Sequence, residues 1–213
     1  MLGRPPGIHR LNSWVWMALA FLVTLGLTAG AVAMFLAPHE NLGIALRTSA
    51  RLAFLFFWPA YAGGALTSLF GDAFSPLKRC ARDLGLAFAG ALLVHLALVA
   101  YLCVSGSVPP ATTFVVFGPA ALLTYLLVLF SVGKMRQAIP AGFWQVVRTV
   151  AMNYVMLAFL DDFIKFRLAE LRDFIMYFPF AALAVIGLLL RLAAWIQHLR
   201  YGWIAPRRVG AES

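Results

Sequence analysis

Long apolar segments separated by short polar segments dominate the pattern along this chain. A helix of about 20 apolar residues is long enough to cross the ~30 Å hydrocarbon core of a bilayer. The sequence contains six such segments, at Trp14–Leu36, Leu52–Phe70, Leu84–Val104, Phe114–Val132, Phe143–Phe163 and Phe174–Trp195. The pattern therefore predicts an all-α protein, a six-helix transmembrane bundle in the lipid bilayer.

The composition supports this class and divides the chain into three parts. Of the 213 residues, 63% are hydrophobic and only 12% are charged. A soluble domain of this size leaves too much of its surface exposed to hide so many apolar residues. We expect residues 1–13 to form an N-terminal tail, 14–195 the bundle and 196–213 a basic tail.

The positions of the basic residues predict the orientation. Ten of them fall on the side of the two tails and the second and fourth loops, and five fall on the other side. The positive-inside rule then places both the N- and C-termini in the cytoplasm. We expect the membrane to be a bacterial inner (plasma) membrane. The net charge of +9 comes without a Lys/Arg-rich run or a nucleic-acid motif, so we expect no nucleic-acid partner.

His95 is the only histidine inside a predicted span. An ionisable side chain near mid-membrane is costly unless it is paired or coordinated, so it marks a candidate functional site. Neutral imidazole is a good ligand for haem iron. The alternative is a neutral histidine that forms a hydrogen bond with another helix. In either case we expect His95 to face the bundle interior, toward the fifth span.

The fifth span carries the other polar candidates. Arg148 lies near one membrane boundary, and Asp161 and Asp162 lie about 20 Å farther along the helix, near the other. Snorkelling at both ends explains each of these side chains alone. Arg148 could also bind a carboxylate or phosphate, the two aspartates could bind a cation, and Tyr154 could form a hydrogen bond within the bundle.

Gly26 and Gly30 form a pair of small residues, four apart, on the first span. Such pairs let helices approach each other closely. We expect this pair to serve ordinary packing within the chain rather than a dedicated dimer face.

Three stretches resemble the ferric-reductase-like transmembrane domain family, which includes the haem-binding membrane subunit of the periplasmic methionine sulfoxide reductase system. The first is the segment from Arg47 to Ala53, which resembles the start of that family's second span. The second is the segment from Lys78 to Phe88, which leads to His95, where that family has a haem histidine in mid-helix. The third begins at Trp144, which precedes position 148 by four residues. There Arg148 replaces the family's histidine, and the second histidine of that helix, expected near Asp161, is also absent.

The resemblance implies electron transfer through b-type haem, with His95 as a possible axial ligand and no catalytic domain in this chain. Met152 and Met156 of the fifth span are weak candidates for the opposite ligand, because methionine also binds haem iron. Without the fifth-span histidines, we expect a degenerate, haem-poor member that acts as an accessory or interaction subunit beside a protein partner. The alternatives are a membrane electron-transfer subunit of an oxidoreductase that uses His95, and a small polytopic transporter.

Overall fold

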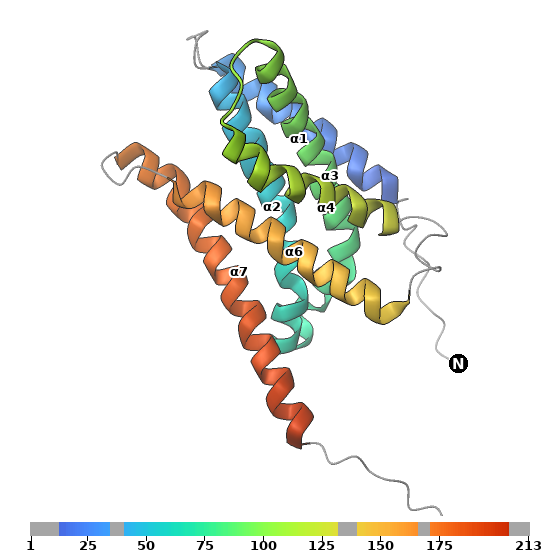
Figure 1. Cartoon of the computed structure of the whole chain (residues 1–213). Coiled ribbons are helices and arrows are strands. Elements are labelled where there is room, and N and C mark those ends of the chain that lie inside the picture. Colours follow the sequence, from blue (N-terminus) through green and yellow to red (C-terminus); the bar gives the residue numbers. More distant parts are fainter. Residues whose placement is uncertain (1–12, 35–40, 132–139, 166–170, 205–213) are drawn as a thin grey trace, which may run out of the picture. The chain divides into compact units, whose positions relative to one another are not determined.

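The structure is a computed structural model that describes residues 13–34, 41–131, 140–165 and 171–204 (Figure 1). The described residues form helices and their connections, without a strand. The elements are α1 (Ser13–Met34), α2 (Asn41–Phe70), the short 3-10 helix η1 (Asp72–Phe74), α3 (Ser75–Val104), α4 (Ala111–Ser131), α6 (Ala141–Ile164) and α7 (Leu171–Ile204).

All six predicted spans are confirmed as helices that are long and apolar enough to cross a membrane. Three helices are clearly longer than their apolar runs: α2 and α3 have 30 residues each, and α7 has 34. Helix α7 continues past residue 195, where the predicted bundle ends, to Ile204. The tail segments 1–12 and 205–213 lie outside the described residues.

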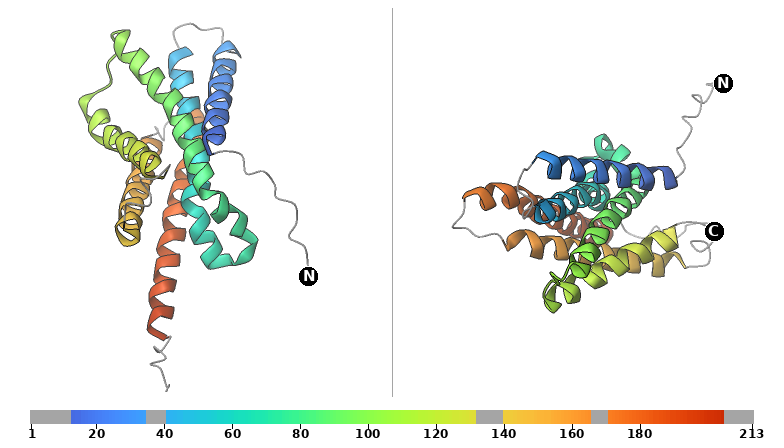
Figure 2. Two further views of the ribbon diagram at one scale, coloured as in Figure 1. Left: turned by 90° about the vertical axis from the view of Figure 1, so that its right-hand side faces the viewer. Right: turned by 90° about the horizontal axis from the view of Figure 1, so that it is seen from above.

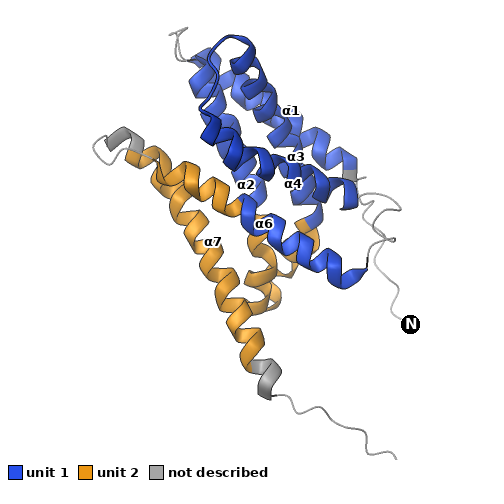
Figure 3. Ribbon diagram, viewed as in Figure 1, with its two compact units in different colours: residues 1–57, 82–155 blue, residues 58–81, 156–213 orange. Residues whose placement is uncertain are grey.

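The chain divides into two compact units (Figure 3). Unit 1 comprises residues 1–57 and 82–155, and unit 2 comprises residues 58–81 and 156–213. Helices α2, α3 and α6 therefore contribute to both units.

A glycine ends helix α3. Gly106 has a φ of 87°, a left-handed conformation that suits glycine, and it follows the end of α3. Its amide bonds to the Cys103 carbonyl, and the next amide, of Ser107, bonds to the Leu102 carbonyl. This pair of bonds is a Schellman motif, which stops the helix by satisfying its last carbonyl groups.

Close helix contacts organise unit 1. Helix α1 lies beside α2 and α3 (Figure 2). At the α1–α3 contact, a Cβ atom added to Gly90 would overlap the main-chain carbonyl of Met17, so only glycine fits there. Phe57 and Phe88 pack with ring centroids 5.0 Å apart and join α2 to α3.

Unit 2 is built around an inward-facing row of small residues on α7. Ala181, Ala184 and Gly187 are buried at helical spacing. A Cβ added to Gly187 would lie 3.1 Å from both the Met156 methyl carbon and the Trp58 indole nitrogen, which shows how tightly these helices pack. The same indole N–H donates a hydrogen bond of 2.6 Å to the Leu183 carbonyl.

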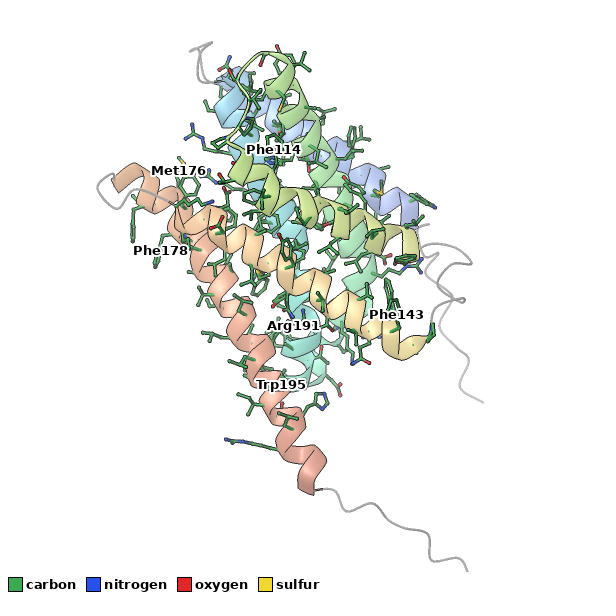
Figure 4. All side chains as sticks on the ribbon, in the orientation of Figure 1. Phe114, Phe143, Met176, Phe178, Arg191 and Trp195 are labelled. Carbon is green, nitrogen blue, oxygen red and sulfur yellow. The ribbon has the colours of Figure 1, made fainter. Side chains whose placement is uncertain are left out.

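Large apolar side chains cover much of the outer surface of these helices. Phe143 and Phe178 project from α6 and α7 (Figure 4), and both are exposed. Water would make such a surface costly, whereas lipid chains suit it. Together with the six apolar helices, this surface indicates an integral membrane protein in contact with the lipid bilayer.

Candidate functional site

His95 and its hydrogen-bond partner are the centre of the candidate site in unit 1. His95 lies on α3, about 14 Å before the end of that helix at the usual helical rise. Its Nδ1 atom is 3.0 Å from the hydroxyl oxygen of Ser49 on α2. The expected direction toward the fifth span is not confirmed, because this hydrogen bond joins His95 to the second span instead.

The hydrogen bonds around Ser49 favour one tautomer of the imidazole. The Ser49 hydroxyl is also 3.0 Å from the Leu46 carbonyl, one turn earlier on α2. A carbonyl oxygen can only accept a hydrogen bond, so the serine hydroxyl is the donor in its bond to the Leu46 carbonyl. The arrangement that satisfies both bonds therefore has Nδ1–H donating to Ser49, which leaves the lone pair of His95 on Nε2.

The three candidate ligands, His95, Met152 and Met156, fit a haem only in part. A histidine whose Nδ1–H is held by a neighbour presents Nε2 to a metal in a fixed orientation. Met156 is fully buried and its methyl group lies beside Gly187, as expected of a packing residue. Met152 is half-buried on α6. His95 would hold haem iron through its imidazole, whereas Met156 belongs to unit 2 and packs there.

Arg148 is exposed on α6, about 10 Å from the first residue of that helix, Ala141. A guanidinium has no lone pair available for iron and stays protonated in proteins. Its exposed place in the first half of α6 is compatible with the predicted position near a membrane boundary.

The aspartates lie at the other end of α6. Asp161 forms an ion pair with Lys165, four residues later, and both side chains are largely exposed. Exposed pairs of this kind stabilise a helix by only a few tenths of a kcal/mol, about 0.3–0.5. Asp162 is half-buried, and the parts of the chain that the structure describes contain no group of three His, Cys, Asp or Glu placed to hold a metal ion. The charged residues Arg167 and Glu170, which follow in the sequence, lie outside the described residues.

Tyr154 has a structural partner. Its hydroxyl donates a hydrogen bond of 3.1 Å to the Val116 carbonyl on α4. Pro119 of α4 has no N–H to bond the Val115 carbonyl four residues earlier. Tyr154 therefore bonds the carbonyl next to the one that proline frees, and this bond joins α6 to that turn of α4.

The expected role of the glycine pair on α1 is wrong. A Cβ added to Gly26 or to Gly30 would meet no atom within 4 Å, so the described part of the chain does not pack against this face. Glycines 26 and 30 leave a shallow apolar surface, which we call the glycine face of α1.

Several polar residues of the structure were not predicted as site residues. Ser49 is the partner of His95, and Thr24 and Thr28 are buried on α1. In unit 2, the Arg191 guanidinium carbon lies 4.5 Å from the centroid of the buried Tyr61 ring (Figure 4 labels Arg191 on α7). The signal for Arg191 was present in the sequence, because an arginine within a long apolar run needs a partner.

Comparison with protein-family models, curated proteins and solved structures found no match for this chain.

Proposed function

We propose that this chain is a haem-poor integral membrane protein of ferric-reductase-like type that acts as an accessory or interaction subunit. The observation that carries the interaction role is the glycine face of α1, which the described part of the chain leaves uncovered. In lipid, small residues favour association because they allow the backbones of two helices to approach closely. The occupant we propose is a transmembrane helix of a partner subunit.

Two features of the polar residues support a haem-poor state. His95 is bonded to Ser49 between neighbouring helices, so its place in the membrane needs no metal. In the fifth span, Arg148 and Asp161 stand where the resembled family has histidines, and neither provides the imidazole of a paired haem site.

The test of the interaction role is purification from membranes of the native host with a tag on this chain. We expect wild type to retain a stoichiometric membrane partner and the double variant Gly26→Leu/Gly30→Leu to lose it. Gly118→Leu is the matched control, because Gly118 is also an exposed membrane-helix glycine with open space around its Cβ position. Equal recovery of a partner by all three proteins, or no partner with wild type, contradicts the proposal.

A second candidate is a one-haem electron-transfer subunit, and the orientation of His95 favours it. The Ser49 bond leaves Nε2 as the lone-pair nitrogen, and this atom would hold b-type haem iron. Such a haem would supply one-electron transfer when bound. This candidate and the first differ in a single observable, the Soret absorption of the purified protein.

A further inference from the structure

Two buried threonines on α1 lack the hydrogen bond that threonine normally makes in a helix. Thr24 is fully buried, Thr28 is 4% exposed, and neither hydroxyl has a hydrogen-bond partner among the described residues. Two other threonines in the chain behave differently: Thr67 and Thr124 each donate to the carbonyl four residues earlier, at 2.8 Å. The hydroxyls of α1 are therefore turned away from the backbone bond that their helix offers.

We propose that Thr24 and Thr28 bind an internal water molecule in unit 1. A buried hydroxyl without a partner is costly, and ordered water is the usual partner of such groups in protein interiors. Side chains four residues apart on a helix have Cβ atoms about 5–6 Å apart. One water with hydrogen bonds of about 2.8 Å spans that separation and can bond to both hydroxyls.

The two-threonine site does not depend on the proposed function. A Soret band in wild type would contradict the proposed function without deciding whether the two threonines bind water.

The test compares the melting temperatures of Thr24→Val, Thr28→Val and Thr124→Val in detergent. Valine keeps the shape of threonine and removes the hydroxyl. If the hydroxyls bind water, Thr24→Val and Thr28→Val lower the melting temperature by about 2–4 °C each, because the water loses a partner. Thr124→Val is the control, since its hydroxyl bonds only within its own helix. A higher melting temperature for the α1 variants, or a change no larger than that of the control, overturns the proposal.

If a variant does not fold, a density map of the wild-type protein tests the proposal instead. The map is recorded in lipid nanodiscs at a resolution that shows ordered water. The expected result is a water peak within hydrogen-bonding distance of the Thr24 or Thr28 hydroxyl. A dry site, or both hydroxyls bonded to the carbonyls of the preceding turn, refutes it.

Discussion

The His95 imidazole and the Ser49 hydroxyl form a hydrogen bond of 3.0 Å that joins α3 to α2. Ser49 is fully buried and its hydroxyl donates a hydrogen bond to the Leu46 carbonyl, so Ser49 can accept one from His95 within unit 1. A polar side chain in a membrane helix needs such a partner. The pair gives His95 a structural role with or without a metal.

Replacing Ser49 with alanine should therefore destabilise the protein. The substitution leaves the Nδ1–H group of His95 without its acceptor, and an unsatisfied buried donor costs about 1–3 kcal/mol. Thermal unfolding in detergent measures the effect, with Ser68→Ala as the control because Ser68 is exposed on the same helix. Equal melting temperatures for the two variants would show that the bond contributes nothing.

Gly90→Ala should destabilise unit 1 while Gly85→Ala should not. The added methyl group at position 90 overlaps the Met17 carbonyl and forces α1 away from α3, and overpacking of this kind costs about 1–3 kcal/mol. At position 85 a Cβ meets no atom within 4 Å, and alanine is the better helix former by about 1 kcal/mol. The melting temperatures of the two variants should move in opposite directions; a parallel shift would contradict the α1–α3 contact.

Arg191 and Tyr61 should show a measurable energetic coupling. The guanidinium carbon lies 4.5 Å from the ring centroid, a distance at which a cation–π contact contributes about 0.5–2 kcal/mol. A double-mutant cycle with Arg191→Leu and Tyr61→Leu measures this contact together with the hydrogen bond between the same two side chains, apart from the cost of burying the charge. Arg200→Leu combined with Tyr61→Leu is the control, since Arg200 is exposed on α7. A coupling energy no larger than that of the control would show that the contact does not contribute to stability.

The distribution of basic residues predicts that both termini lie in the cytoplasm. Reporter fusions after Ser75 and after Ser213 should report the cytoplasm, and a fusion after Pro109 the opposite side. This topology places the start of α3 and the end of α4 on the same side of the membrane. One contact agrees with it: Arg82, near the start of α3, donates a hydrogen bond of 2.9 Å to the carbonyl of Ser131, the last residue of α4. A periplasmic signal from the Ser213 fusion would refute this topology.

The spans were predictable because hydropathy is a local property of the sequence. Each apolar run became a helix, and only the ends differed, as in α2, which begins at Asn41 rather than Leu52. The residues between these two positions include Arg47 and Arg51, which lower the hydropathy of the segment without preventing a helix.

The partners of the polar residues were not predictable in the same way. The sequence identified His95 as unusual, but the choice of Ser49 as its partner depends on how α2 and α3 pack. For the same reason the spacing of Gly26 and Gly30 identified a surface for close approach but not what covers it. Arg191 is different, because its place within an apolar run already indicated a partner.

We propose that this chain binds little or no haem, and the absorption spectrum of the purified protein is the direct test. Wild type and His95→Ala are expressed in haem-replete cells and purified in the same detergent. We expect neither protein to show a Soret band. A Soret band in wild type contradicts the haem-poor state. Its loss in His95→Ala would then establish the second candidate, in which Nε2 of His95 binds the iron.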